Sequence, residues 1–307
     1  MIKNKLAHAV ALVLASGSLA STASASSTTS FTMYNQFQTT SASATDGWVW
    51  GGVGVGTPKS NDVVPSPTTN PGISAQANPG FVGTADSNND GNGDTPFTYI
   101  GSSHLNWAAQ LTDAGDSLQI SQADSVERYS FAAEIDTGAG AWMDAGDAEA
   151  GKAPTGWKHQ TDIGLISVAE DMLISIAATA VGGNALDNFG MTVFEGMDTN
   201  TGNYSHHGGW NTNGTASTND NPFGTTGVSY IKHDGTVDSS NLFTFNAEAG
   251  KVYSLYLGGA GVGTWNNNVE NYQLDITTSA VPVPAAAWLM GSAILGLVGM
   301  RRKAKAV

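Results

Sequence analysis

Hydrophobic and polar residues alternate over short stretches of this chain, and polar segments rich in Gly, Asn, Asp, Ser and Thr separate these stretches. In 128–136, for example, Tyr129, Phe131 and Ala133 alternate with polar or charged neighbours, as in a strand with one buried face. No convincing amphipathic helix occurs between the two ends of the chain. The pattern predicts strands at 31–38, 48–55, 97–100, 104–111, 116–120, 128–136, 163–168, 171–179, 189–194, 228–233, 242–246, 252–258 and 270–277.

Many short strands with turn signals between them predict an all-β fold. We expect an antiparallel β-sandwich, jelly-roll-like, with long polar loops over 56–96 and 198–226. Residues 26–280 are sufficient for one such domain.

The N-terminal segment has the three parts of a secretory signal peptide. Lys3 and Lys5 give it a positive start, an apolar stretch follows over 6–19, and small residues lead to Ala25. We expect signal peptidase to cleave after Ala25, so that 1–25 are removed.

The C-terminal segment 281–307 also has three parts: a Pro-rich start, an apolar run over 285–300 and a basic end. Sixteen residues rise about 24 Å as a helix, slightly short of a permanent membrane span, and a C-terminal anchor is one interpretation. The segment closely resembles the PEP-CTERM tags that exosortases recognise in Gram-negative bacteria with extracellular polysaccharide, although Val283 replaces the usual Glu. The sorting signal consists of Val281, Pro282, Pro284, Arg301 and Arg302.

The resemblance implies an exported protein that is held briefly in the inner membrane by its C-terminal helix. It then reaches the cell surface, the outer membrane or the extracellular matrix.

The net charge of the chain limits the classes of partner that it can bind. Removing 1–25 and 281–307 removes six of the 12 Lys and Arg residues and none of the 26 acids, which leaves a net charge near −20. Such a surface repels nucleic acid and anionic membranes and attracts cations. Because the chain has no Cys, a metal must be held by His, Met, carboxylates or a less common group.

Trp157 and His159 stand just before the predicted strand 163–168. On an extended segment their side chains would point to the same face. His206 and His207 are adjacent in a Gly-rich segment. Neutral imidazoles suit copper or zinc, and a set of His ligands without thiolate favours copper over a structural zinc.

The segment GWKHQTDIGLISV resembles the Trp-x-His segment of the MopE/CorA family of bacterial surface copper-binding proteins. In that family a tryptophan oxidised to kynurenine joins two histidines in holding Cu(I). The resemblance implies that Trp157 is the modified ligand and His159 the first imidazole. The second imidazole is left open between His206 and His207, with His104 behind them. The plainer interpretation, a rim aromatic beside a surface histidine, also stays open.

A second candidate cation site lies in residues 86–97. Oxygen ligands at alternate positions and a Gly at the sixth match the start of an EF-hand-type Ca²⁺ loop. The twelfth position, which should be Glu, is Phe97, so the full pattern fails. The tentative calcium ligands are Asp86, Asn88, Asp90 and Asp94.

These features lead to a ranking of functions. The first is a copper-binding protein of the cell surface that binds copper and does not turn over a substrate. The second is a structural or adhesive matrix protein associated with extracellular polysaccharide and stiffened by calcium. A glycan-active enzyme ranks last, since no motif names its catalytic carboxylates. We expect a copper ion, exosortase, signal peptidase and extracellular polysaccharide as partners, and we expect neither nucleic-acid binding nor catalytic residues.

Overall fold

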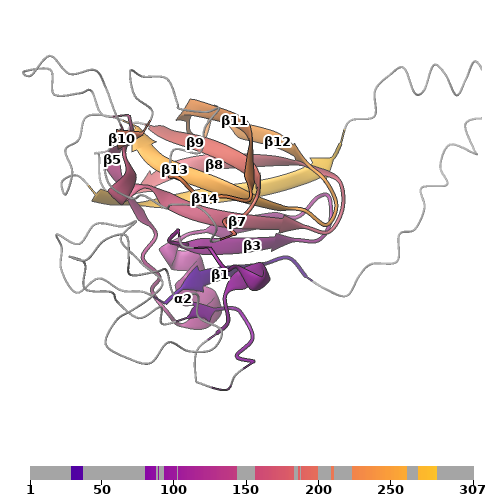
Figure 1. The fold of residues 1–307 in the computed structure, drawn as a ribbon. Coiled ribbons are helices and arrows are strands. Elements are labelled where there is room, and N and C mark those ends of the chain that lie inside the picture. Colours follow the sequence, from indigo (N-terminus) through magenta and orange to yellow (C-terminus); the bar gives the residue numbers. More distant parts are fainter. Residues whose placement is uncertain are drawn as a thin grey trace, which may run out of the picture.

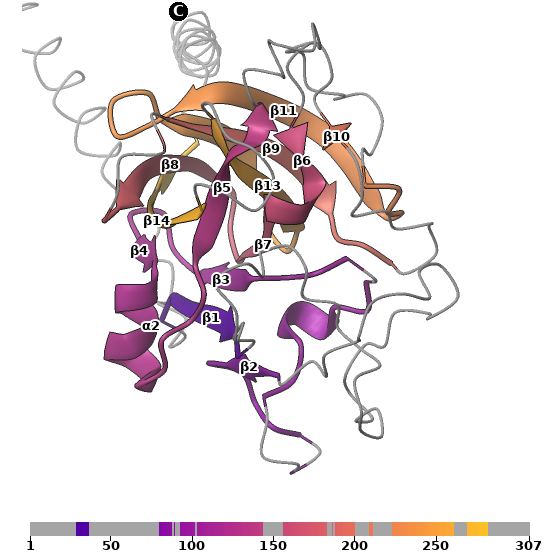
Figure 2. The same cartoon turned by 90° about the vertical axis from the view of Figure 1, so that its left-hand side faces the viewer.

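The computed structural model describes residues 29–36, 80–87, 89, 93–101, 103–143, 156–182, 186, 188–199, 209–210, 223–260 and 269–281. Within these residues most of the chain is β-structure, and 12 strands belong to one continuous sheet. Figures 1 and 2 show this sheet folded into two layers, with the single α-helix of the described part at its lower edge. The prediction of an all-β sandwich is thus confirmed at the level of fold class.

The larger layer follows the order β11-β9-β13-β7-β3-β1-β2. Within this layer β13 pairs with β9 on one side and with β7 on the other. The strands are β11 (Val228–Val237), β9 (Asn188–Gly196), β13 (Val252–Ala260), β7 (Asp162–Val168), β3 (Trp107–Leu111), β1 (Phe31–Asn35) and β2 (Phe81–Val82).

The smaller layer is centred on β14, which pairs with β8 on one side and with β4 on the other. An edge strand, β12, pairs with the far side of β8. The strands are β12 (Phe243–Ala247), β8 (Met172–Val181), β14 (Val269–Ala280) and β4 (Ser117–Ile120).

One strand, β5 (Asp136–Met143), joins the two layers. Its first residues pair antiparallel with β14, and its later residues pair parallel with β13. A second parallel pair joins β3 to β7. The sheet is therefore mixed: most of its strand pairs are antiparallel, as expected, but the pairs β5–β13 and β3–β7 are parallel.

The main core lies between the two layers. It contains Leu255 and Leu257 of β13 opposite Leu274 and Ile276 of β14, all with no exposed surface. A second apolar cluster covers the outer face of the larger layer and includes Tyr256. Because β13 is covered on both faces, its residues from 253 to 260 are all buried, whereas β14 alternates buried and half-buried positions.

The stretch 128–136 is not a strand. The helix α2 (Gln122–Tyr129) occupies its beginning, and β5 starts only at Asp136. The Ser121 hydroxyl caps the helix by accepting a hydrogen bond from the Asp124 N–H at 3.0 Å. Ser130 ends the helix in the left-handed region at φ 54°. The apparent alternation at Tyr129 and beyond therefore comes from a helix end and the loop after it.

The predicted strand at 97–100 was also wrong. Pro96–Thr98 form a short 3-10 turn, η2, and Phe97 has φ 53°, which a strand does not allow. The strand at 48–55 lies outside the described residues. The other predicted strands are confirmed to within a few residues at their ends.

No helix in the described part of the chain is long and apolar enough to cross a membrane. The predicted signal peptide and the apolar run 285–300 lie outside the described residues. Of the sorting signal only Val281 is described, directly after the end of β14.

Candidate functional site

The backbone around Trp157 is fixed by a small second sheet. Strand β6 (Gly156–Trp157) pairs antiparallel with β10 (Gly209–Trp210), so that Gly209 lies opposite Trp157 and Trp210 lies opposite Gly156. Strand β6 packs against β5, and Figure 2 shows β10 beside β6. The pairing brings together two segments that are about 50 residues apart, each next to a candidate copper ligand.

The chain does not stay extended from Trp157 to His159, as the sequence led us to expect. Strand β6 ends at Trp157, and Lys158–Gln160 form the 3-10 turn η4. In a 3-10 helix successive residues are about 120° apart, so the alternation of side chains between two faces ends at Trp157. Only the backbones of Trp157 and His159 belong to the described structure.

The turn η4 is held against the core on both sides. The Thr137 hydroxyl of β5 donates a hydrogen bond to the Gln160 carbonyl at 2.5 Å. Just after the turn, the Ile163 N–H donates to the Asn106 side-chain oxygen at 3.0 Å, and the Asn106 N–H donates to the Ile163 carbonyl at 2.9 Å. The candidate copper segment is thus anchored to two strands of the sandwich.

Lys158, between the two candidate ligands, is buried. Its ammonium nitrogen lies 5.6 Å from the centre of the Phe223 ring, within the range of a cation–π contact. Burial lowers the pKa of Lys158 below its ordinary value. The turn therefore buries one basic side chain against the Phe223 ring.

His104, named as the reserve ligand, is buried beside the same segment. Its Nε2 lies 2.6 Å from the Thr161 carbonyl oxygen and must donate to it, since a carbonyl only accepts. Burial lowers the pKa of His104 to about 4, against the opposing effect of that hydrogen bond. The ring is therefore neutral, and its Nε2 is occupied by the backbone.

His233 lies elsewhere, on β11, with its Nδ1 2.8 Å from the Tyr230 hydroxyl and its ring 6.2 Å from that of Trp142. His206 and His207 lie outside the described residues. Within the described part of the chain, no three His, Asp or Glu side chains come together as a metal site. The choice between His206 and His207 therefore stays a prediction.

The predicted calcium loop is described at its two ends. The Asp94 N–H donates to the Ala85 carbonyl at 2.6 Å, which closes the loop next to Asp86. The Asp94 carboxylate accepts hydrogen bonds from the Ser87 N–H, at 3.2 Å, and from the Ser87 hydroxyl. Asn88 and Asp90 lie outside the described residues, so the calcium site stays a prediction.

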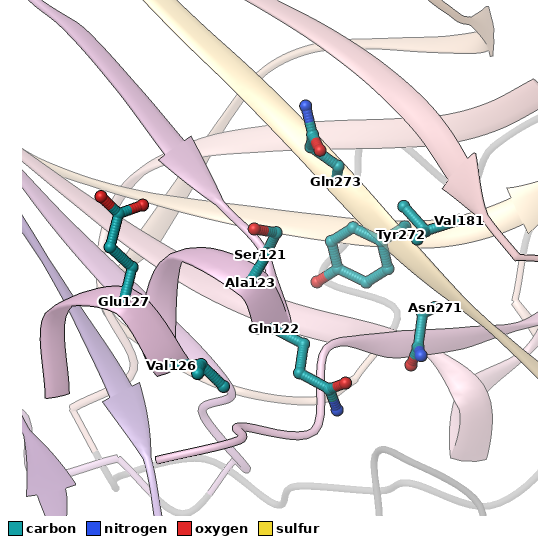
Figure 3. Close-up of a pocket in the computed structure, with 9 residues that line it drawn as sticks. All are labelled: Ser121, Gln122, Ala123, Val126, Glu127, Val181, Asn271, Tyr272 and Gln273. Atoms are coloured by element: carbon teal, nitrogen blue, oxygen red, sulfur yellow. The ribbon is translucent and has the colours of Figure 1, made fainter. Parts of the chain in front are cut away.

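A groove of about 390 Å³ lies between α2 and the smaller layer. Figure 3 shows the Tyr272 ring at one side of it, with Val126 and Gln122 of the helix across from the strands. Its lining is mostly apolar, carries Glu127 as its acidic side chain and contains no histidine. None of the residues predicted to bind a metal contributes to this groove.

The sequence analysis missed one group of polar residues inside the sandwich. Asp162 of β7 and Glu270 of β14 are buried carboxylates. The sequence pattern could have identified both acids as buried. Glu270 is in phase with the buried Tyr272 and Leu274, and Asp162 is in phase with the buried Ile166, so each acid occupies a core position of its strand.

No family model and no curated sequence matches this chain. Among solved structures, one similar chain is CorA, a surface-associated copper-binding protein important in copper acquisition by Methylomicrobium album BG8. It is 12% identical, with 55% of this chain and 96% of CorA covered, at a TM-score of 0.29. Another is the pre-peptidase C-terminal domain of collagenase from Bacillus anthracis, at 14% identity, 55% and 94% coverage and a TM-score of 0.23. At these TM-scores neither structure decides the fold or function of this chain.

Proposed function

We propose that this protein is an exported copper-binding protein, with Trp157, His159 and either His206 or His207 as copper ligands. The observation that carries the proposal is the antiparallel pairing of β6 with β10, in which Gly209 lies opposite Trp157. This pairing joins the Trp-x-His segment to the segment that follows the histidine pair.

Chain connectivity links the histidines to this pairing. His159 comes two residues after Trp157, and His207 comes two residues before Gly209. In an antiparallel pair the chain leaves Trp157 and enters Gly209 at the same end of the β6–β10 pair. Two residues span at most about 7 Å, which keeps each histidine close to the paired positions.

The donor set fits copper. Imidazole nitrogens without a thiolate suit copper better than a structural zinc site, and the chain has no Cys. The other two histidines of the exported part are less suitable, because His104 donates its Nε2 proton to Thr161 and His233 lies on β11 beside Tyr230.

We further propose that Trp157 is converted to kynurenine. Dioxygen would open the five-membered ring of the indole, and hydrolysis would release one ring carbon as formate. The indole nitrogen then becomes an aromatic amine that can act as a ligand. The side chain loses one carbon and gains one oxygen, so a mass measurement can detect the change.

The proposed role is binding, with no substrate turned over. Export would follow from the signal peptide 1–25 and the sorting segment 281–307. The last strand ends at Ala280, immediately before Val281, which supports a sandwich domain that stops where the sorting segment begins.

The test is a copper titration in competition with a chromophoric Cu(I) chelator. We expect His159→Ala to weaken copper binding by more than about 100-fold, which exceeds the usual effect of losing a residue that only supports a ligand. One of His206→Ala and His207→Ala should do the same, and His233→Ala serves as the matched control. Unchanged affinity in His159→Ala would rule out this site.

The alternative is a calcium-stiffened matrix protein. It would gain support if the protein bound no copper and instead associated with the polysaccharide of its host in a calcium-dependent way.

A further inference from the structure

One side of the sandwich is formed by two edge strands, β11 and β12. Each is the last strand of its layer in the described part of the chain, where β11 pairs with β9 and β12 pairs with β8. The two strands follow each other in the sequence, and the segment 238–242 carries the chain from the larger layer to the smaller one. Figure 1 shows β11 and β12 side by side. Because an edge strand presents main-chain N–H and C=O groups to a further strand, this side is where a second chain could extend the sheet.

Strand β11 has an irregular backbone. Its register with β9 shifts between Tyr230 and Lys232 and again between 234 and 237. Such irregularities interrupt the row of main-chain groups and oppose the addition of another strand. In contrast, β12 pairs with β8 in unbroken register along its whole length, Phe243–Ala247. The more receptive of the two edges is therefore β12.

A single side chain of β11 closes the β12 edge. Lys232 Nζ donates a hydrogen bond to the Thr244 carbonyl oxygen at 2.9 Å and lies 4.7 Å from the centre of the Phe243 ring. Phe243 exposes none of its surface and belongs to the main core. The ammonium thus occupies a main-chain acceptor of β12, and a strand added there would have to displace it or bury its charge. Lysines on edge strands are a common protection against edge-to-edge pairing.

The sequence of β12 fits a second copy of the same strand. An antiparallel pair centred on Phe245 places Phe243 of one copy opposite Ala247 of the other, and all three positions are buried. It also places Thr244 opposite Asn246, the two positions of β12 that are not buried. The strand carries no charged residue, although the exported part of the chain is strongly acidic. Two copies can therefore meet along β12 with matched side chains and without like charges directly opposite each other.

We propose that Lys232 is an autoinhibitory lock on a self-association surface formed by β12. With its ammonium on the Thr244 carbonyl the protein is a monomer, and without it two copies pair along β12. The pair is isologous, because the same strand contributes from both copies, and it joins their smaller layers into one sheet. The proposal is independent of copper, since neither Lys232 nor any residue of β12 is a candidate copper ligand.

The experiment compares the full chain with its Lys232→Met variant by sedimentation velocity over a range of protein concentrations. Methionine keeps an unbranched apolar stem over the Phe243 ring but has neither the charge nor the N–H donors. We expect Lys232→Met to dimerise at a protein concentration at least about 10-fold lower than the parent, because the added strand displaces no charged donor. Hydrogen exchange of the backbone amides over 243–247 should slow as the dimer forms.

Three further variants locate the surface. Lys232→Arg keeps the charge and the N–H donors and should remain monomeric like the parent. Lys251→Met removes the same charge from an exposed lysine paired with Glu195, and it should also remain monomeric. Asn246→Lys, added to Lys232→Met, introduces a charge at an exposed position of the β12 edge and should restore the monomer.

Lys232→Gln is measured in parallel, because it also removes the charge but retains a polar side chain. Monomeric Lys232→Met and Lys232→Gln proteins at every concentration would overturn the proposal. Association that Asn246→Lys leaves unchanged would also overturn it, because the copies would then meet elsewhere. Equal association of Lys251→Met would show that the loss of any positive charge is sufficient, and that Lys232 is not a lock.

Discussion

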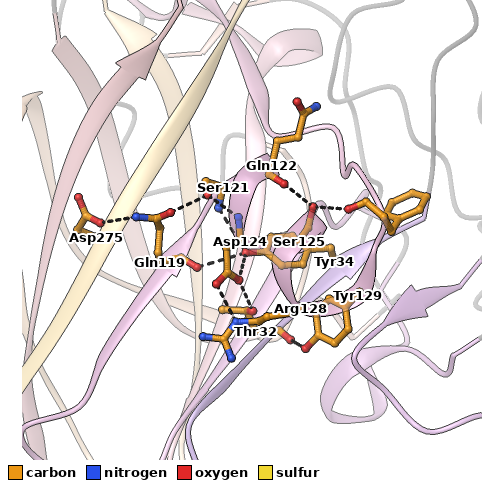
Figure 4. A network of polar contacts seen from close by, with 11 residues as sticks. Thr32, Tyr34, Gln119, Ser121, Gln122, Asp124, Ser125, Arg128, Tyr129 and Asp275 are labelled. Carbon is orange, nitrogen blue, oxygen red and sulfur yellow. Dashed lines mark hydrogen bonds and ion pairs between the residues drawn. The ribbon is translucent and has the colours of Figure 1, made fainter.

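Asp124 and Asp162 are both buried carboxylates, but their surroundings differ. The Asp124 carboxylate accepts hydrogen bonds from the Thr32 hydroxyl, the Tyr34 hydroxyl and Arg128 Nε, each at 2.7 Å (Figure 4). Burial and the neighbouring carboxylate of Asp124 raise the pKa of the Tyr34 hydroxyl, which keeps it protonated as a donor. This cluster joins α2 to β1 by protein groups alone.

The Asp162 carboxylate accepts a hydrogen bond from the Tyr272 hydroxyl, which in turn accepts one from Trp107 Nε1. The difference separates two uses of a buried acid. Where protein donors surround a carboxylate, its role is to hold the fold together. Asp162, through Tyr272 and Trp107, instead links β7, β14 and β3 in the interior between the two layers.

The largest expected effect is at the first cluster. Asp124→Ala should lower the free energy of unfolding by about 3–5 kcal/mol, because it leaves the donors of Thr32, Tyr34 and Arg128 without their common acceptor. Urea denaturation measures this. Glu127→Gln, on the exposed side of the same helix, should change it by less than about 0.5 kcal/mol. If both substitutions lowered the free energy of unfolding equally, Asp124 would not hold the fold together through these hydrogen bonds.

The second prediction concerns pH near the Asp162 cluster. His104 has an ordinary pKa of 6.5 and a pKa of about 4 when folded. Between these values the unfolded chain binds the proton and the folded chain does not, so stability falls as the pH falls from about 6.5 to about 4. The loss should reach about 3 kcal/mol.

His104→Gln provides the control for this pH effect. Its amide nitrogen can still donate to the Thr161 carbonyl, but the side chain does not titrate. The unfolding free energy of this variant should therefore fall less steeply over the same pH range. An identical pH profile for both proteins would show that His104 is not responsible.

The smallest effect is expected for the hydroxyl of Tyr272. Tyr272→Phe removes the donor to Asp162 and the acceptor for Trp107, and should cost about 1–3 kcal/mol in thermal or urea unfolding. Tyr230→Phe, whose hydroxyl contacts His233 at an exposed position, is the control. A cost for Tyr272→Phe no larger than that of Tyr230→Phe would argue against a connected polar cluster.

Much of the β-structure could be predicted from the sequence, because alternation is a local signal. The alternating stretch 270–277 lies within β14, and 252–258 lies within β13. The helix α2 was missed although Ser121 and Asp124 mark its start, because the alternation after Tyr129 was given more weight. The crossing of β5 between layers depends on pairing with distant strands, and no local pattern reveals it.

The candidate sites, too, depend on contacts between distant segments that no local sequence pattern reveals. The sequence could name Trp157 and His159, but it could not show that Gly209 pairs opposite Trp157, because the two segments are far apart in the chain. It also predicted an extended path through His159 where the chain turns at η4. Glu270 and Asp162 could have been found as acids in buried registers, whereas the packing of the Gln160 amide against Gly138 becomes visible only once β5 is in place.

The most direct test of the copper proposal is native mass spectrometry of the protein purified from copper-replete cells of its own host. We predict one copper ion per chain, with Trp157 lacking one carbon and carrying one additional oxygen. A chain with unmodified Trp157 and no copper under these conditions would contradict the account.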